Sequence, residues 1–144
     1  MLQRNCAGGV VFSGEKLLLL RNDKNEWVLP KGLVPAGALS YQVAKDRVAA
    51  EAGVSPVEIV CPAGETRYEF YSTTRKCPVC NHIVWYAMRA FGEDSAFNAA
   101  LGFTGGGFFP LDRALDLITY SQDKALAAAA WEKLRRPALY LGCR

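Results

Sequence analysis

The sequence predicts an α/β fold, specifically an α/β/α sandwich with a mixed β-sheet. Two observations lead to this prediction. Extended apolar segments and segments of helical period follow one another in the order strands, helix, strands, helix. Hydrophobic residues make up 51% of the 144 residues and charged residues 22%, so the chain carries enough apolar side chains to bury one core. We therefore expect residues 1–144 to form a single domain.

Two strands are expected at the start of the chain, over residues 4–12 and 16–21. The first contains the apolar triplet Val10-Val11-Phe12, and the second is rich in leucine. A Ser-Gly pair between them provides a turn, so a β-hairpin is the simplest interpretation. A short third strand, residues 27–29, leads into a loop rich in proline and glycine.

An amphipathic helix is expected over residues 41–52. Ser40 is a favourable N-cap, because its hydroxyl can accept a hydrogen bond from a free backbone N–H, and Gly53 suits the left-handed residue that ends many helices. One face of this helix is apolar, whereas Arg47 and Glu51 lie along its flank and face the preceding loop. A loop packed on the flank of a helix forms a site.

More strands are expected after this helix, over residues 56–61, 64–71 and 82–91. The sequence KCPVCN, residues 76–81, is then the turn at the tip of a long hairpin.

The last third of the chain is expected to contain a loop and two helices. Residues 94–107 are small, polar and glycine-rich, which favours a flexible loop, because they carry neither a Walker lysine nor the spacing of a dinucleotide-binding motif. A helix ending at Ile118 and an alanine-rich helix over residues 122–136, capped by Ser121, follow it.

Composition and charge exclude several classes of protein. The formal net charge is +3 and the chain has no long run of basic residues, so the sequence predicts neither a duplex-DNA binder nor a membrane-surface protein. No window approaches the roughly 18 apolar residues of a membrane span, and the N-terminus lacks the pattern of a signal peptide. Five cysteines, an odd number, favour a reducing compartment. We therefore expect a cytoplasmic protein, and a small acidic ligand such as a nucleotide is compatible with its charge.

The segment from Gly32 to Val54 resembles the Nudix box, whose pattern is Gly, five residues, Glu, seven residues, Arg-Glu, an apolar residue, any residue, Glu-Glu, any residue, Gly and an apolar residue. Gly32 takes the first position, Val48 the apolar one and Glu51 the last Glu, and Gly53 and Val54 close the pattern. The flanking Leu-Pro-Lys-Gly and the later phrase FFPLDRALDLITY are also similar to Nudix enzymes of the ADP-ribose and dinucleoside polyphosphate kind. The resemblance covers nearly the whole chain and implies the Nudix fold.

Three of the four acidic positions of the box are changed. Ala38 stands at the first Glu, Asp46-Arg47 replaces the Arg-Glu pair, and Ala50 replaces the first of the paired Glu residues. Nudix hydrolases cleave nucleoside diphosphates linked to another group with Mg²⁺ or Mn²⁺, and such ions need several converging carboxylates. The resemblance therefore implies that Glu51 is the residual catalytic residue and a weak Mg²⁺ ligand, and that hydrolysis is weak or absent.

Arg47 lies one helical turn before Glu51, which is the spacing of a salt bridge. One hypothesis is that its guanidinium occupies part of the volume where the family holds its metal, so that phosphate binds without activation of a water. The alternative is an ordinary surface ion pair worth about 0.2–0.5 kcal/mol. Glu65 and Glu69, on the strand expected after the box, would either replace the missing carboxylates or face solvent.

Other residues are candidates for binding the ligand. Basic groups can pair with phosphates, and the faces of aromatic rings can stack on a base. The candidates are Trp27, Lys31, Gly32, Arg47, Arg67 and Tyr68, with Tyr120 as a further aromatic. The alternative for each aromatic residue is a place in the core.

Cys77 and Cys80 form the Cys-Pro-x-Cys pair of a zinc knuckle, in which a tight turn aims two thiolates at one point. Structural zinc needs four ligands, and the remaining candidates are Cys6, Cys61, His82 and Cys143. Three outcomes stay open. The site is completed within the chain, or it is shared between two hairpin tips in a homodimer, or no zinc binds and the pair is free or forms a disulfide.

Two functions are compatible with these residues. The first is a Nudix-type pyrophosphohydrolase acting on a nucleoside diphosphate derivative, such as a dinucleoside polyphosphate or ADP-ribose, with Mg²⁺ or Mn²⁺ as cofactor. The second is a catalytically inactive module that binds a nucleotide or another phosphate-containing ligand in a regulatory or interaction role. Release of phosphate-containing products in the presence of Mg²⁺ or Mn²⁺ separates the two.

Overall fold

The computed structural model describes residues 1–136 of the chain. The strands are β1 (Leu2–Ser13), β2 (Lys16–Asn22), β3 (Trp27–Val28), β4 (Lys31–Leu33), β5 (Val57–Ser72), β6 (Cys77–Ala90) and β7 (Phe103–Pro110). The helices are α1 (Ser40–Ala52), α2 (Leu111–Leu117) and α3 (Ser121–Arg135), and a short 3₁₀ turn covers Ala99–Leu101. None of the helices within these residues is long and apolar enough to cross a membrane. Cys143, a candidate zinc ligand, lies outside the described residues.

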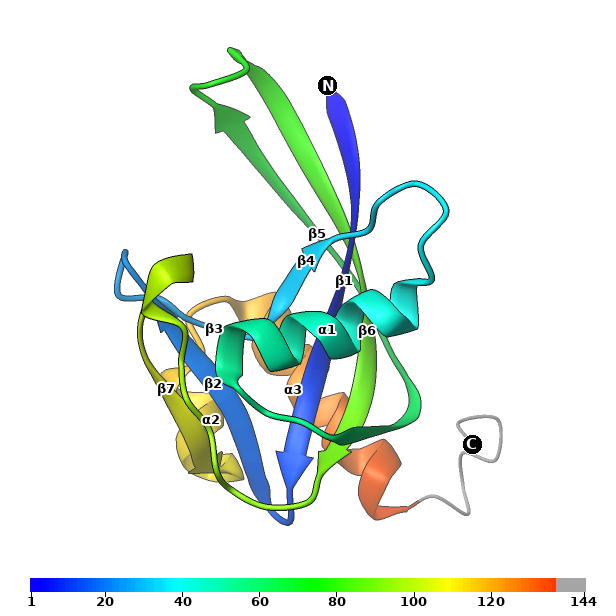
Figure 1. The fold of residues 1–144 in the computed structure, drawn as a ribbon, viewed down its shortest axis with the longest axis vertical. Helices are drawn as coiled ribbons and strands as arrows, with labels where there is room; N and C mark the ends of the chain where they lie inside the picture. Colours follow the sequence, from blue (N-terminus) through cyan, green and yellow to red (C-terminus); the bar gives the residue numbers. More distant parts are fainter. Residues whose placement is uncertain (137–144) are drawn as a thin grey trace.

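The strands form one mixed sheet whose central path runs β3-β2-β1-β6-β5 (Figure 1). β1 runs parallel to β6, from Leu2 opposite Val79 to Phe12 opposite Arg89, and the other strand pairs are antiparallel. β4 adds to β1, and β7 adds to β2. The prediction of a mixed sheet is confirmed.

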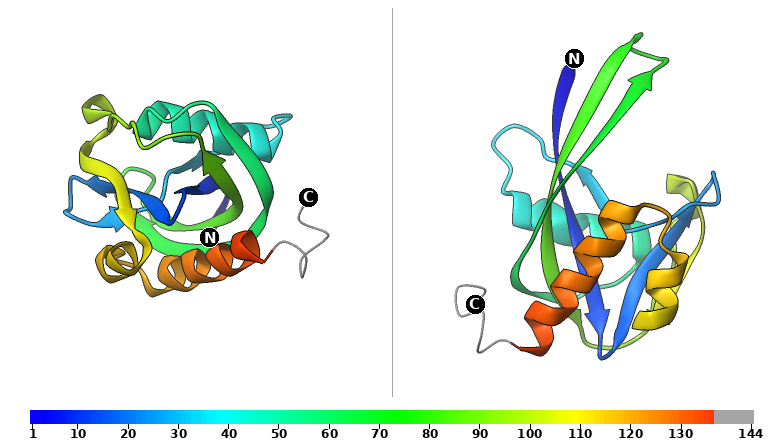
Figure 2. Two further views of the ribbon diagram at one scale, coloured as in Figure 1. Left: turned by 90° about the horizontal axis from the view of Figure 1, so that it is seen from below. Right: turned by 180° about the vertical axis from the view of Figure 1, so that it is seen from behind.

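Helix α1 covers one face of this sheet, and α2 and α3 cover the other (Figure 2). The leucine-rich strand β2 contributes to both cores. Leu17 and Leu19 pack in the core under α2 and α3, whereas Leu18 and Leu20 pack in the core under α1. A strand buried on both faces has a continuous apolar sequence, because side chains of both orientations are covered. The α/β/α sandwich is therefore confirmed.

Two adjacent glycines in β1 let neighbouring residues approach the sheet closely. A Cβ on Gly9 would lie 2.8 Å from Cγ2 of Val48 on α1, and a Cβ on Gly8 would lie 2.5 Å from the Trp85 ring. Carbon atoms in good contact are about 3.5–4.0 Å apart. The short distance between α1 and β1 therefore requires a residue without a side chain at position 9.

The helix ends differ from expectation at their N-terminal residues. Gly53 has φ 65° and its N–H donates to the carbonyl of Ala49, as expected for a left-handed C-terminal residue. Ser40, however, is the first helical residue, and its hydroxyl pairs with the hydroxyl of Tyr86 instead of capping the helix. Ser121 is likewise the first residue of α3 and makes no cap bond. A tertiary partner has replaced the local cap at Ser40.

The second half of the chain contains more strand than expected. The segments expected at residues 56–61 and 64–71 are one strand, β5, whose register shifts twice between Ile59 and Gly64. The glycine triplet at residues 105–107, expected in a flexible loop, lies in β7 and pairs with β2. Glycine is disfavoured in strands, but a Cβ on Gly106 would lie 3.0 Å from a backbone oxygen of β2. Close pairing with β2 therefore overrides the local preference.

The β5–β6 hairpin continues past the body of the molecule, with the start of β1 alongside it (Figure 1). Its turn lies at residues 73–76, because Ser72 pairs with Cys77. The expectation of a turn over residues 76–81 is wrong, since Cys77 and Cys80 both lie within β6. Side chains three positions apart on a strand point to opposite faces, so the two thiols do not converge. Within residues 1–136, no group of three or more His, Cys, Asp or Glu side chains is placed to hold a metal ion.

Candidate ligand-binding cleft

A cleft of about 370 Å³ opens between the C-terminal part of α1, the start of α3 and the loop that joins β2 to β3. Residues far apart in the sequence meet in it. Its charged and amide-bearing residues include Glu26, Lys31, Glu51, Arg67, Gln122 and Asp123, and its aromatic residues are Tyr68, Phe103 and Tyr120.

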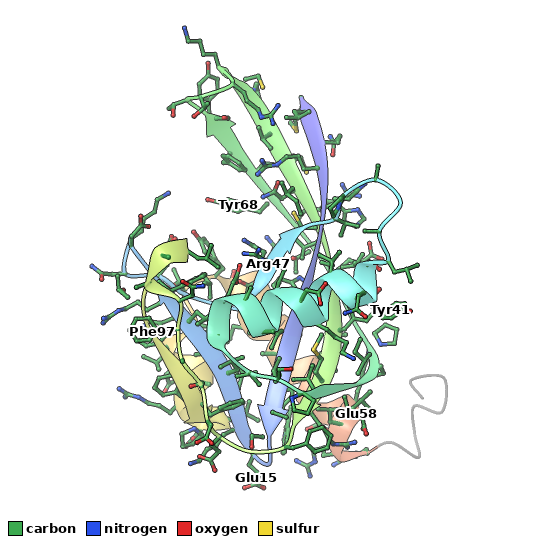
Figure 3. All side chains as sticks on the ribbon, in the orientation of Figure 1. Glu15, Tyr41, Arg47, Glu58, Tyr68 and Phe97 are labelled. Carbon is green, nitrogen blue, oxygen red and sulfur yellow. The ribbon has the colours of Figure 1, made fainter. Side chains whose placement is uncertain are left out.

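Arg47 and Glu51 form the expected ion pair on α1, where Figure 3 shows Arg47 on the side of the helix next to β4. Arg47 Nη2 donates to Glu51 Oε2 at 2.6 Å, and Nε donates to the same oxygen at 3.2 Å. Glu51 Oε1 accepts the backbone N–H of Lys31 at 3.3 Å. The side chain of Glu51 is only 7% exposed and that of Arg47 33%. The salt bridge is confirmed, and its burial distinguishes it from a surface pair.

Gly32 makes room for the Arg47 side chain. A Cβ on Gly32 would lie 2.6 Å from both Cδ and Nε of Arg47. Any larger residue at position 32 would therefore push the guanidinium away from Glu51. Gly32 itself is not among the described residues that line the cleft. The absence of a side chain at the first glycine of the box therefore leaves the space in which Arg47 reaches Glu51.

Burial raises the pKa of the Glu51 carboxyl, whereas the hydrogen bonds and charge of Arg47 and the nearby Lys31 act in the opposite direction. The effect of burial is the larger one. Arg47 is the main group that favours the ionised form of Glu51, and it offsets the effect of burial in part.

The residues at the box do not fit a divalent metal ion. Mg²⁺ is held by carboxylates and waters, and more than one carboxylate is usual where waters are to be activated. Ala38 and Ala50 offer no ligand atom, Asp46 is exposed and accepts from Gln42, and Glu51 is engaged by Arg47. The positive guanidinium of Arg47 therefore occupies the one carboxylate that a metal ion would need, and its charge repels such an ion.

Lys31 is a cation of the cleft wall. Its ammonium acts on the carboxyl groups of Glu26, Glu51 and Asp123, in each case favouring the ionised form. Within residues 1–136 it forms no direct ion pair with any of them. The charge of Lys31 is therefore available to an anionic ligand.

Arg67 borders the cleft through its backbone. Its carbonyl accepts from Gln122 Nε2 at 2.9 Å, and its N–H donates to Gln122 Oε1 at 3.4 Å. The neighbouring side chains of Thr66 and Tyr68 lie on the side of β5 that carries the cleft, since they contact Trp85 and Tyr120. Strand alternation then directs the Arg67 side chain to the other face.

Tyr68 and Tyr120 form an aromatic corner of the cleft, with ring centroids 5.6 Å apart and planes at 61°. Tyr68 is 41% exposed and lies at the base of the projecting hairpin (Figure 3). The Tyr120 hydroxyl donates to Glu26, and this hydrogen bond is the main cause that raises the pKa of Tyr120 and lowers that of Glu26. Tyr120 is thereby fixed, and Tyr68 offers ring surface to a ligand.

Trp27 is placed in the core rather than at the cleft wall. Its ring meets Phe109 edge to face at 5.3 Å between centroids, and the Arg21 guanidinium lies 5.7 Å from the ring centre. It packs against the core under α2 and α3. The core alternative considered for the aromatic candidates fits Trp27.

Glu65 and Glu69 are exposed on β5 and do not replace the missing box carboxylates. Glu65 pairs with His82 across the strands, and its side chain is 61% exposed. Neither residue is among the described residues that line the cleft. The solvent-facing alternative fits both residues.

No sequence motif identifies two of the carboxylates that line the cleft, Glu26 and Asp123. Glu26 lies in a polar loop, and Asp123 lies in the first turn of a helix, where acids are common. One sequence signal does single out Asp123. It shares a helical face with Ala127, Ala130 and Leu134, which are buried, and an acid on the apolar face of a helix is unusual.

The fold is that of the Nudix hydrolases, although no family model matches the sequence. The Nudix domain of Shewanella oneidensis NrtR, solved with ADP ribose, is 18% identical with a TM-score of 0.71, and the match covers 93% of this chain and 90% of that one. A Caenorhabditis elegans Ap4A hydrolase, solved as a binary complex, is 18% identical with a TM-score of 0.68, covering 92% and 98%. The Escherichia coli dihydroneopterin triphosphate pyrophosphohydrolase is 13% identical with a TM-score of 0.66, covering 88% and 95%. At these identities, the likeness establishes the shared fold.

Proposed function

We propose that this chain binds a nucleotide-like small molecule with a phosphate group in the cleft, and that it hydrolyses phosphoanhydrides slowly or not at all. It is a Nudix-fold protein whose metal site has been replaced by an internal ion pair. Its function is then recognition of the ligand, in a regulatory or interaction role.

One observation carries this proposal: the 2.6 Å contact between Arg47 Nη2 and Glu51 Oε2. The guanidinium satisfies the buried carboxylate from within the helix. A metal ion at this place would have to displace Arg47 and would find no second carboxylate at positions 38 or 50. The chemistry of water activation by a divalent ion therefore lacks its donors here.

The ligand class is supported by the residues of the cleft and by the structural neighbours. Lys31 supplies a positive charge for phosphate, and Tyr68, which packs on Phe70 and Tyr120 and is 41% exposed, supplies ring surface for a heterocycle. The neighbours carry the names of Ap4A, ADP ribose and dihydroneopterin triphosphate, each a phosphate group joined to a heterocycle. Lys31 would hold the phosphate by charge alone, and no proton transfer is required of it.

The test has two parts. Calorimetric titration with ADP-ribose, Ap4A and nucleoside diphosphates in EDTA measures binding, and product analysis with Mg²⁺ or Mn²⁺ measures hydrolysis. We expect binding without metal and little or no turnover. A turnover on the order of 1 s⁻¹ or more, which is common for enzymes, would overturn the proposed loss of catalysis. Absence of binding to all the compounds would overturn the ligand class.

Restoring the family's acids should restore metal binding. The triple variant Ala38→Glu, Arg47→Glu and Ala50→Glu returns carboxylates to the three changed positions of the box, and positions 38 and 50 are exposed, so the substitutions there are tolerated sterically. We expect Mn²⁺ affinity to rise at least about tenfold, because hard divalent ions bind converging carboxylates. The matched control, Ala38→Glu with Ala50→Glu, keeps Arg47 and should gain less. Equal gains in both variants would show that Arg47 does not obstruct the metal.

A further inference from the structure

The carboxylates of the cleft differ in what they already bind. Glu51 accepts from Arg47 and from the N–H of Lys31. Glu26 accepts from the Tyr120 hydroxyl and, at 2.9 Å, from Asn22 Nδ2. Both are therefore committed to partners within the protein.

Asp123 has no such partner within residues 1–136. It caps neither its own helix nor any other element, and Asp23, the remaining carboxylate of the wall, is exposed at the rim. Burial raises the pKa of Asp123, and the positive charge of Lys31 opposes this shift only in part. The side chain is only partly buried, and its oxygens stay accessible, so a donor of the ligand can replace water there.

The start of α3 holds Asp123 in a fixed position. Gln122 uses both atoms of its amide on the backbone of Arg67, which ties this turn to β5. One turn later, Ala127 is fully buried in the core and anchors the same helical face. The carboxylate is thus presented by a helix tied to the sheet, in the same cleft as Tyr68 and within the electrostatic influence of Lys31.

We propose that Asp123 determines which heterocycle the cleft accepts, by taking a bidentate hydrogen bond from a ring N–H and an adjacent amino group. This rests on the proposed function. Two parallel N–H donors match the two oxygens of a carboxylate, as they do when a guanidinium pairs with one. The edge with these donors is the 2-amino-4-oxopyrimidine edge, which guanine and pterin rings share. Adenine presents an amino group beside a ring acceptor and lacks it.

The rest of the cleft accommodates the rest of such a ligand. The heterocycle would lie against Tyr68 with its donor edge on Asp123, and the phosphate would meet Lys31. The other two carboxylates near Lys31, Glu26 and Glu51, are already hydrogen-bonded and do not compete for the donors. The cleft then separates a site for the phosphate from a site for the base.

A purely structural role for Asp123 makes a different prediction. An acid in the first turn of a helix stabilises the helix dipole by about 0.3–1 kcal/mol without touching any ligand. Asp112 occupies the first turn of α2 and is exposed. Asp112→Asn is therefore the matched control for Asp123→Asn, because it removes the same charge from the same kind of position outside the cleft.

The experiment is calorimetric titration of the wild type, Asp123→Asn and Asp112→Asn with GDP, IDP, ADP, guanosine and neopterin in EDTA. We expect the wild type to bind GDP at least about tenfold more tightly than ADP, with IDP between them because it lacks the 2-amino group. Asp123→Asn should lower GDP affinity about tenfold or more and ADP affinity by less than about threefold. Asp112→Asn should leave all affinities unchanged. If guanosine binds more tightly than neopterin, the ligand that carries this donor edge is a guanine nucleotide. If neopterin binds more tightly, the ligand is a pterin. Either result supports the role of Asp123.

Each unexpected binding result leads to a different conclusion. Equal affinity for GDP and ADP, or a ratio unchanged in Asp123→Asn, overturns this inference and leaves the proposed function standing. Binding of guanosine that the phosphates of GDP do not strengthen supports the inference and overturns phosphate recognition. Binding of none of the five compounds overturns both.

Discussion

The two walls of the cleft treat a buried carboxylate in opposite ways. On the α1 wall, Glu51 is almost fully buried, and Arg47 from the same helix neutralises it. On the α3 wall, Asp123 is half-buried, and no hydrogen bond from residues 1–136 reaches it. Burial raises the pKa of both carboxyl groups.

The difference indicates that the two carboxylates have different roles. A carboxylate that the protein satisfies internally is part of the fold and is closed to ligands, whereas one that the protein leaves unsatisfied retains its capacity to accept. In this chain the carboxylate of the box helix is held by Arg47. The carboxylate that the proposal assigns to ligand recognition lies on the α3 wall, outside the box pattern.

Removing the internal partner should have the largest effect on stability. In Arg47→Ala, the buried Glu51 loses its cation, and we expect a loss of about 2–3 kcal/mol in the free energy of unfolding at pH 7. Loss of one partner from a fully buried pair costs about 3–5 kcal/mol, and the partial exposure of Arg47 reduces this. The loss should shrink as the pH falls through the pKa of Glu51, which burial raises above its ordinary value. Urea unfolding at several pH values measures it.

The control for Arg47→Ala is Arg135→Ala on α3. Arg135 lies 3.6 Å from Glu132, and both side chains are about half exposed, at 48% and 47%. An exposed pair contributes about 0–1 kcal/mol, so its loss should change stability by less than about 0.5 kcal/mol. Equal effects at the two positions would show that Arg47 and Glu51 are an ordinary surface pair.

Gly32→Ala should have an intermediate effect that depends on Arg47. The new Cβ would lie 2.6 Å from the Arg47 side chain and would displace it, so we expect a loss of about 1 kcal/mol. In an Arg47→Ala background the same substitution should be neutral or stabilise by up to about 0.5 kcal/mol, because alanine restricts the unfolded chain. A double-mutant cycle on the free energy of unfolding measures this coupling. Additive effects would contradict the role assigned to Gly32.

The smallest expected effect is the pH dependence of Asp123→Asn. The folded-state pKa of Asp123 lies above its ordinary value of 3.8. Its contribution to stability is therefore fully present below pH 3.8 and is lost as the pH rises through the folded-state pKa. Asparagine does not titrate, so the stability of Asp123→Asn relative to the wild type should improve between about pH 4 and pH 7, by less than about 1 kcal/mol. A falling trend for Asp123→Asn would contradict the burial of its charge.

The structure also separates features that local sequence can predict from features that it cannot. Helix α1 and its Arg47–Glu51 pair were predictable, because hydrogen bonds and side-chain contacts within a helix connect residues only three or four positions apart. The turn expected at Cys77 and Cys80 was not found there. Strand pairing sets that register, through Ser72 opposite Cys77, and it overrides the turn preference of the Pro-containing pair.

The sequence by itself determined the α/β class, the first hairpin, helix α1 and the loss of the box carboxylates, since each of these depends on residues that are neighbours along the chain. Only the tertiary structure decided which carboxylates face the cleft. Glu26 and Asp123 line the same cleft because β2 is paired within the sheet and α3 packs across its face, so their placement depends on long-range contacts that no local pattern encodes. The physical reason is the range of the interactions: secondary structure is stabilised locally, whereas the cleft exists only once the sandwich has closed.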